Sequence, residues 1–249
     1  MSRPRTDGVQ VVLALALALV AVAMVGALLT SLRSEPADLE ATLQQYAAAP
    51  VPDIPAAGGG AGPAAPTTQV SPAWVEQTAT ASGIPAVAVR AYAAAQLATP
   101  CALGWTTLAG IGWVESQHGT LGGRQLLADG HSSTPILGPA LDGVGPVAAI
   151  PATDDSAALH SDREWDHAAG PMQFITSTWM TWRSDGDGDG VTDPYDLDDA
   201  ALATARYLCA SGDLDTGEAW TAAVLSYNHS REYVDAVHAA ATAYAARVG

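Results

Sequence analysis

The stretch I-G-W-V-E-S-Q-H-G, residues 111–119, places one carboxylate, Glu115, within an apolar run. Upstream, Trp105 and Leu108 continue that run at helical spacing, which predicts a largely buried helix. A buried carboxylate is costly unless it is paired or has a chemical task. Position alone therefore leaves two interpretations: a functional carboxylate, or one at the exposed C-terminal end of a core helix that Gly119 closes.

The composition of the chain excludes two classes of partner. The 249 residues are 49% hydrophobic and 14% charged, which allows one ordinary domain plus extra segments. The 26 acidic residues outnumber the 10 basic ones, giving a formal charge of -16, and every basic residue is arginine. Because no phosphate-binding stripe can form from so few cations, we expect neither nucleic acid nor an anionic membrane surface as a partner.

The first 32 residues predict an N-terminal signal anchor. Arg3 and Arg5 precede an almost uninterrupted apolar run, 9–29, and a bilayer needs about 20 such residues. No obvious cleavage site follows, although a cleaved signal remains the alternative. We expect a single-pass membrane protein with its folded part outside the cytoplasm, or a secreted protein if the segment is cleaved.

A linker and one helical domain are expected after the anchor. Residues 33–70 are rich in Pro, Ala and Gly and predict a flexible tether. Residues 71–249 predict a mainly α domain without strand pairs, in which 120–168 forms a long irregular loop that walls a cleft. Besides the helix that carries Glu115, the expected helices are a short one after Ser71, 85–97, the second half of 169–179 extending to Trp182, 200–209, one from an N-cap at Thr216 to Tyr227, and 233–247.

The chain contains two cysteines, Cys101 and Cys209. An even count in an exported chain suggests one disulfide, which would join the segment before the Glu115 helix to the end of a later helix. Two buried thiols are the alternative.

Three separated segments carry a pattern of polar residues: V-E-S-Q-H-G at 114–119, G-P-M-Q-F at 170–174 and S-Y-N-H-S at 226–230. At these residues the chain resembles the lytic transglycosylases of peptidoglycan, which share the lysozyme-like helical fold of goose-type lysozymes and soluble transglycosylases. The form G-P-M-Q-F-I-x-S-T-W, followed by an acidic D-x-D-x-D-G loop, is most similar to the membrane-bound murein transglycosylase B-like branch found in actinobacteria. The resemblance covers roughly residues 72–235.

The resemblance implies that Glu115 is the sole catalytic acid and base. An ordinary glycosidase needs two carboxylates. A lytic transglycosylase cleaves the β-1,4 bond between N-acetylmuramic acid and N-acetylglucosamine with the muramyl C6 hydroxyl as nucleophile, leaving a 1,6-anhydro end, so one glutamate is enough. It has to give a proton and take one, and we expect apolar neighbours such as Trp113 and Met172 to raise its pKa.

The same resemblance implies a set of substrate-binding residues. Met172 and Gln173 would line the glycan cleft, Tyr227 and Asn228 would orient Glu115 or a sugar acetamido group, and Ser116 would support the network. The plainer interpretation gives Met172 to the core, Gln173 to a helix surface and Tyr227 to the core with a satisfied hydroxyl.

Four further aromatic and imidazole side chains are expected to be structural. Trp105 and Trp220 are assigned to the core. His118 and His229, although next to motif residues, are assigned to the surface.

The acidic stretch D-G-D-G-D-G-V-T-D-P-Y-D-L-D-D, residues 185–199, resembles the first half of an EF-hand loop. Asp185, Asp187 and Asp189 alternate with glycines, and the carbonyl of Val191 is a further candidate ligand for Ca²⁺. The spacing of an ordinary loop gives Asp196 the last position, whereas the resemblance favours Asp199. A solvated acidic turn without metal is the alternative. We expect a structural Ca²⁺ and no organic cofactor.

Together these features predict a tethered, monomeric lytic transglycosylase that acts on peptidoglycan strands in cell-wall remodelling. Two rivals remain: a hydrolytic muramidase on the same fold, and a non-catalytic, calcium-stabilised glycan-binding module.

Overall fold

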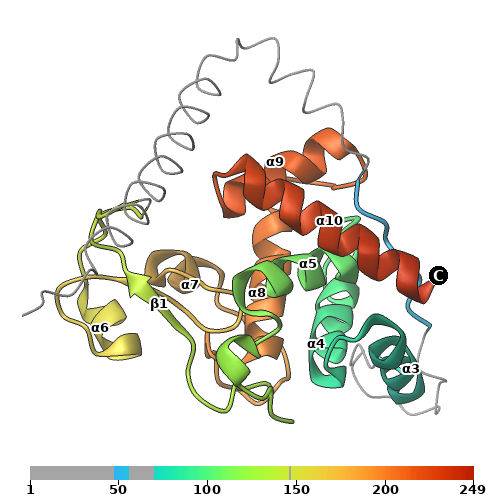
Figure 1. Ribbon diagram of the computed structural model, residues 1–249, viewed down its shortest axis with the longest axis horizontal. Helices are drawn as coiled ribbons and strands as arrows, with labels where there is room; N and C mark the ends of the chain where they lie inside the picture. The colour runs from blue at the N-terminus through green and yellow to red at the C-terminus, as the bar shows by residue number, and fades with distance from the viewer. Residues whose placement is uncertain (1–47, 56–69, 146) are drawn as a thin grey trace, which may run out of the picture. The chain divides into compact units, whose positions relative to one another are not determined.

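The computed structural model describes residues 48–55, 70–145 and 147–249, which belong to one compact unit (Figure 1). The predicted anchor and most of the predicted linker lie outside these ranges. Among the residues described, no helix has the length and apolar character that a membrane span requires.

The described chain is mainly helical, as the sequence predicts. The elements are α3 (Pro72–Ser82), α4 (Ala86–Leu97), α5 (Trp105–Ser116), the 3-10 turn η1 (Leu121–Gly123), β1 (Leu137–Ala140), α6 (Asp154–His160), β2 (His167–Ala169), α7 (Thr176–Trp182), α8 (Leu197–Cys209), α9 (Gly217–Tyr227) and α10 (Arg231–Val248). In Figure 1, α6 and β1 lie on one side of the molecule, and α3 lies on the other near the end of α10.

Helix α5 is the buried centre of the domain. Every residue from Trp105 to Gly112 is buried, and the helix packs against α4, α8 and α10. Two glycines permit this close packing. A Cβ atom on Gly110 would lie 2.7 Å from the carbonyl oxygen of Val237, and one on Gly112 would overlap the hydroxyl of Tyr92. The two helices that flank α5 therefore approach its backbone. Trp105, the first residue of α5, and Trp220 on α9 are buried, as expected.

The predicted helix boundaries are close to the observed ones except near residue 172. Thr216 accepts a hydrogen bond from the amide of Ala219 and caps α9, as predicted. Helix α8 begins at Leu197 rather than at residue 200, because Asp196 caps it through the amide of Asp198. Helix α7 begins only at Thr176, so Met172 and Phe174 precede it in a turn, where the sequence had placed them on the helix.

The segment 120–168 contains more structure than the sequence predicts. The expectation of no strand pairs is wrong, because β1 and β2 pair antiparallel, with Leu137 opposite Ala169. Helix α6 also lies in this segment, where Thr153 and Ser156 form a reciprocal capping box. These short elements have no long hydrophobic period, which is why the pattern does not show them.

Histidine and aspartate side chains hold this region together. His160 contacts Asp166 at 3.0 Å, and His167 contacts Asp162 at 2.9 Å. Asp166 also accepts hydrogen bonds from both the amide and the hydroxyl of Thr176 at the start of α7. The segment is thereby joined to the helix that follows the G-P-M-Q-F motif.

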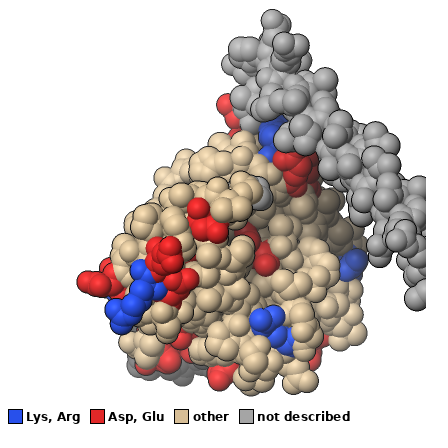
Figure 2. Space-filling model, turned by 60° about the vertical axis from the view of Figure 1, so that its left-hand side comes forward, with Lys and Arg blue, Asp and Glu red and all other residues tan. Residues whose placement is uncertain are grey.

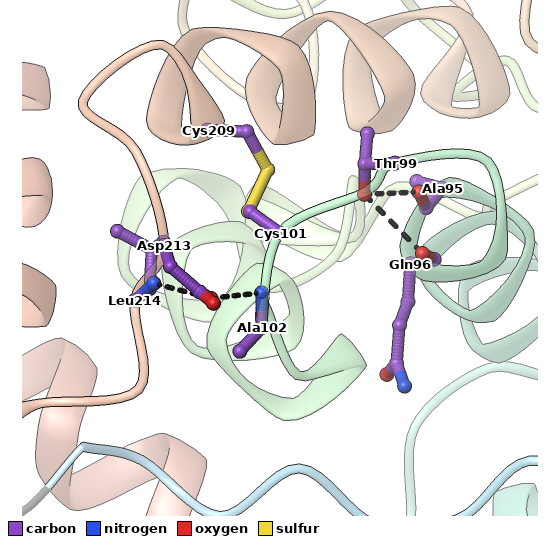
Figure 3. The surroundings of a disulfide bond; sticks show 8 residues. All are labelled: Ala95, Gln96, Thr99, Cys101, Ala102, Cys209, Asp213 and Leu214. Carbon is purple, nitrogen blue, oxygen red and sulfur yellow. Dashed lines mark hydrogen bonds between the residues drawn. A yellow bond between two sulfur atoms is a disulfide. The ribbon is translucent and has the colours of Figure 1, made fainter.

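The predicted disulfide between Cys101 and Cys209 is confirmed (Figure 3). It joins the turn before α5 to the end of α8, across a sequence separation of 108 residues. Beside it, the carboxylate of Asp213 accepts hydrogen bonds from the amides of Ala102, at 2.7 Å, and Leu214. Closure of so long a loop reduces the entropy of the unfolded chain and is worth about 4–5 kcal/mol in the loop-entropy model.

Residues 48–55 pack against the N-terminal end of α5. Ala49 is buried, and the carbonyl of Pro50 accepts a hydrogen bond from the hydroxyl of Thr106 at 2.7 Å. A Cβ atom on Gly104 would lie 2.6 Å from the same carbonyl. This part of the predicted linker is therefore held on the domain.

Candidate active site

Glu115 lies in the last turn of α5, where the helix leaves the core. Its Oε1 accepts a hydrogen bond of 2.6 Å from the hydroxyl of Tyr233, in the first turn of α10. Burial raises the pKa of Glu115 to about 7, although the hydrogen bond from Tyr233 favours the ionised form and opposes this shift. Both protonation states are therefore populated near neutrality, as a group that both gives and takes a proton requires.

Tyr233 is a candidate that the motifs missed. The resemblance implies that Tyr227 and Asn228 orient Glu115, whereas the hydroxyl that contacts the carboxylate belongs to Tyr233 on α10. The sequence shows Tyr233 only as an apolar position at the start of the last helix, where Ser230 accepts a hydrogen bond from its amide. Its role depends on the crossing of α5 and α10, which no local pattern reveals.

Ser116 connects the Glu115 helix to the G-P-M-Q-F motif. Its hydroxyl donates to the carbonyl of Pro171 at 2.6 Å and accepts from the amide of Gly119 at 2.8 Å. The side chain is buried, so both bonds are protected from water. Ser116 fixes the end of α5 against the segment 170–174 and has no exposed atom with which to meet a ligand.

Tyr227 connects the same segment to the third motif. Its hydroxyl donates to the carbonyl of Met172 at 2.7 Å and lies 3.3 Å from the hydroxyl of Thr204 on α8. Its ring is stacked on that of Tyr233, with a centroid separation of 6.5 Å. The three sequence motifs therefore meet: Ser116 holds residue 171 and Tyr227 holds residue 172. Tyr227 also stacks on Tyr233, whose hydroxyl donates to Glu115.

A tight turn presents Gln173. Ala169 and Phe174 exchange backbone hydrogen bonds across it, and Gln173 has a left-handed φ of 53°. The side-chain amide of Gln173 donates to the carbonyl of Gly170 at 2.8 Å. Gly170 has a φ of 77°, and a Cβ atom there would overlap the carbonyl of Pro194, so only glycine allows the turn to lie against the acidic loop.

Gln173 and Tyr227 share a pocket of about 210 Å³. The other residues that line it are Phe174, Ile175, Thr178, Tyr207, Ser226 and His229. This set, drawn from the described residues, contains no carboxylate. Amide, hydroxyl and aromatic groups side by side can hydrogen-bond and stack against a sugar.

Several of the expected site residues lie elsewhere. The side chain of Met172 is completely buried and packs over Gly112, so it lines the core and not a cleft. Asn228 is exposed as the residue that follows α9, and its amide donates to the carbonyl of Val224. Trp113 is 46% exposed and, two residues before Glu115, lies on the opposite side of the helix. It is therefore not an apolar neighbour of the carboxylate.

The expectation for the two histidines is half right. His229 is exposed, as predicted. His118 is buried, and its placement on the surface was wrong. Its two ring nitrogens lie 3.1 Å from the hydroxyl of Tyr92 and 2.9 Å from that of Tyr244. Gln117 and His118 both have left-handed φ values, 52° and 59°, and this sharp reversal turns the imidazole inward.

The acidic loop brings together three carboxylates that could hold a metal ion. Ligand oxygens of Asp185, Asp187 and Asp199 lie within 4.8 Å of one another. Asp199 is buried and accepts hydrogen bonds from the amides of Gly186 and Asp193. Burial, together with repulsion from Asp187 and Asp185, raises the pKa of Asp199 to about 6. Hard oxygen donors that repel one another at this spacing fit a divalent cation such as Ca²⁺.

The other predicted ligands differ from this group. Asp196 caps α8, as described above, so Asp199 and not Asp196 joins the cluster. Asp189 stands outside the three carboxylates and accepts a hydrogen bond from the amide of Val191 at 2.7 Å. Asp189 and Val191 are both exposed in the loop.

On the face shown in Figure 2, acidic side chains gather in patches around a broad area without formal charge, and basic side chains are few. This distribution agrees with the net charge of -16. A neutral surface suits an uncharged polymer better than a polyanion.

No protein-family model and no curated protein sequence matches the chain. Solved structures similar to it include the Escherichia coli lytic transglycosylase Slt35 in complexes with bulgecin A and with calcium, at 17% identity and a TM-score of 0.43, covering 72% of this chain and 76% and 77% of those chains. SltB3 from Pseudomonas aeruginosa, in complex with NAG-anhNAM-pentapeptide, has the same identity and TM-score and covers 70% of this chain and 64% of its own. A likeness of this degree assigns neither family nor function.

The raised pKa of Glu115 predicts a pH-dependent change in stability for Glu115→Gln. The unfolded glutamate ionises near 4.5 and the folded one near 7, so the wild type loses stability as the pH rises between these values. The glutamine variant cannot ionise and escapes this loss. We expect its free energy of unfolding to exceed that of the wild type by about 1–3 kcal/mol at pH 8 and to match it at pH 4.

Denaturant unfolding at the two pH values measures the difference. Glu76→Gln, at an exposed position on α3, is the matched control and should change stability little at either pH. An equal effect of Glu115→Gln at pH 4 and pH 8 would show that the carboxyl is not perturbed.

Proposed function

We propose that the protein is a peptidoglycan lytic transglycosylase with Glu115 as its catalytic acid and base. The observation that carries the proposal is a carboxyl whose pKa is raised to about 7 and which accepts a hydrogen bond from Tyr233. The hydrogen bonds of Ser116 and Tyr227 to the carbonyls of residues 171 and 172 bring the three distant motifs together next to it. Carboxyls with pKa values shifted this far by burial are concentrated at functional sites.

The chemistry proceeds in two proton transfers. Protonated Glu115 gives its proton to the glycosidic oxygen as the bond to C1 of the muramyl unit breaks, which releases the 4-hydroxyl of N-acetylglucosamine. The resulting carboxylate then takes the proton of the muramyl C6 hydroxyl as O6 bonds to C1. The product is a 1,6-anhydro end, no water is consumed, and Glu115 is protonated again. One carboxyl therefore suffices for both steps.

The tyrosines of α9 and α10 position this carboxyl. The hydroxyl of Tyr233 donates to the carboxylate in the second step and keeps its plane fixed. Tyr227, by holding the carbonyl of Met172, supports the turn that presents Gln173 to the pocket that both side chains line. In this role Gln173 would hydrogen-bond the glycan, and the rings of Tyr227 and Tyr207 would form its apolar floor.

In the same proposal, the apolar run of residues 9–29 retains the enzyme at the cell membrane and the linker lets the domain reach the glycan strands of the wall. The support is the length of the apolar run and the arginines before it. We also propose that Ca²⁺ is bound by Asp185, Asp187 and Asp199, with Asp189 and the carbonyl of Val191 as further ligands, and that it holds the loop against α8 without taking part in the reaction.

Product analysis tests the reaction. Digestion of purified peptidoglycan by the full chain should yield anhydro-muropeptides in mass spectra, and Glu115→Gln should lower the rate by about 10²–10⁴-fold because proton transfer is lost. Glu76→Gln, at an exposed position, should retain the wild-type rate. Products with only reducing ends, heavier by one water, would identify a hydrolytic muramidase. Glycan binding without cleavage by the wild type would identify a binding module.

Thermal unfolding with calcium or a chelator tests the metal site. Saturating Ca²⁺ should stabilise the wild type by about 2–3 kcal/mol at a concentration of 100 Kd, because it binds only the folded loop. Asp199→Asn should abolish this response. Asp196→Asn, whose amide oxygen can still accept the cap hydrogen bond from Asp198, should keep the response. A wild type whose melting temperature ignores calcium would contradict the site.

A further inference from the structure

A second pocket flanks the end of α5, on the side away from Glu115. Its volume is about 350 Å³, within the size range of small-molecule sites, roughly 300–1,000 Å³. It lies between the ends of three helices and is lined by Ser82, Gly83, Trp113, His118, Ala240, Ala243, Tyr244 and Arg247. None of these residues takes part in the proposed reaction.

Trp113 forms an exposed aromatic wall of this pocket. It is 46% exposed, and the other six tryptophans, all within the described residues, are buried or only partly exposed. Its ring centroid lies 5.7 Å from that of His118, which is in turn fixed by Tyr92 and Tyr244. The indole is therefore supported by the imidazole, and its exposed part is a surface suited to the apolar face of a sugar ring.

Arg247 gives the pocket a positive charge. It is the only charged side chain among the described residues that line it, in a chain of net charge -16. One of its five N–H donors, at Nη1, donates to the carbonyl of Ser82 at 2.9 Å, and the guanidinium carbon lies 5.7 Å from the centre of the Tyr244 ring. These contacts hold the guanidinium at the rim with further donors for a carboxylate.

The remaining lining groups do not alter that charge. Burial lowers the pKa of His118 to about 4, so the imidazole is neutral at pH 7. Tyr244 is a neutral phenol whose hydroxyl lies within hydrogen-bond distance of His118. An anion that enters the pocket therefore meets one cation and no carboxylate from the residues that line it.

We propose that this pocket binds a sugar with a free carboxylate, namely a muramyl unit whose lactyl group carries no peptide. The indole of Trp113 stacks on the sugar ring and Arg247 pairs with the lactyl carboxylate. A muramyl unit with its stem peptide has an amide in place of that carboxylate and loses the charge that Arg247 recognises. The ligand class rests on the proposed function. The pocket would direct the enzyme to glycan from which peptides have been removed.

The pocket and the catalytic carboxyl are separate sites. Tyr244 and Tyr233 are eleven residues apart on α10, which corresponds to about 16 Å along a helix. Occupation of the pocket therefore leaves Glu115 free.

Ligand titration by saturation-transfer NMR on the full chain tests the proposal. The probes are N-acetylmuramic acid, its lactyl methyl amide and N-acetylglucosamine. We expect the acid to bind at least about tenfold more tightly than the amide, since a charge-assisted pair is lost in the amide. Arg247→Gln should weaken binding of the acid by about the same factor, and Arg247→Lys, which keeps the charge, should restore most of it.

Trp113→Leu provides an independent variant that removes the ring and keeps the charge, and it should also weaken binding of the acid. Neither substitution alters the proposed catalytic groups, so anhydro-product formation from purified peptidoglycan should stay at the wild-type rate. Equal binding of the acid and the amide, or unchanged binding in Arg247→Gln, would overturn the proposal. Binding of a peptide ending in D-alanine in preference to the sugar acid would also overturn it. If the wild type does not cleave peptidoglycan, the proposed reaction is contradicted. The binding proposal is then still tested, because binding is measured separately.

Discussion

Helix α5 is buried between α4 and α10, and the positions of the site residues follow from this burial. Gly110 and Gly112 let both neighbours approach the helix backbone, and the helix leaves the core only in its last turn. Glu115 is consequently fixed in a place where its charged form is poorly solvated, and the carboxyl must find a partner from a neighbouring helix. Tyr233 supplies that partner because the first turn of α10 lies next to the last turn of α5.

The surrounding segments stabilise this arrangement from outside. The disulfide from Cys101 to Cys209 ties the start of α5 to the end of α8. At the other end, the hydroxyl of Ser116 holds the turn at 170–174, and Gly170 lets that turn lie against the acidic loop. A change in the acidic loop would therefore reach the site through the turn. A cation bound in the loop, as proposed above, would stabilise the site without taking part in the reaction.

Local sequence patterns predicted the features that local physics determines. Hydrophobic periodicity predicted the long helices. The residue type of Thr216 predicted the N-cap of α9, and the size of Trp105 and Trp220 predicted that both are buried in the core. Features set by distant contacts were not predictable. The inward turn of His118 follows from two successive left-handed residues, and the pairing of β1 with β2 depends on strands of three and four residues. The contacts of Tyr233 and Trp113 depend on how α5 packs against α10, which no local pattern predicts. Met172 matched a motif for the cleft, yet its side chain fills the core.

The last turn of α5 thus has two faces, with Glu115 and its tyrosines on one and Trp113 with Arg247 on the other. This environment holds Glu115 half-protonated near neutrality. Titration of its side-chain carboxyl by ¹³C NMR, assigned through Glu115→Gln, measures this directly. The structure predicts a midpoint near pH 7. A midpoint near 4.5, the ordinary value for glutamate, would contradict the account.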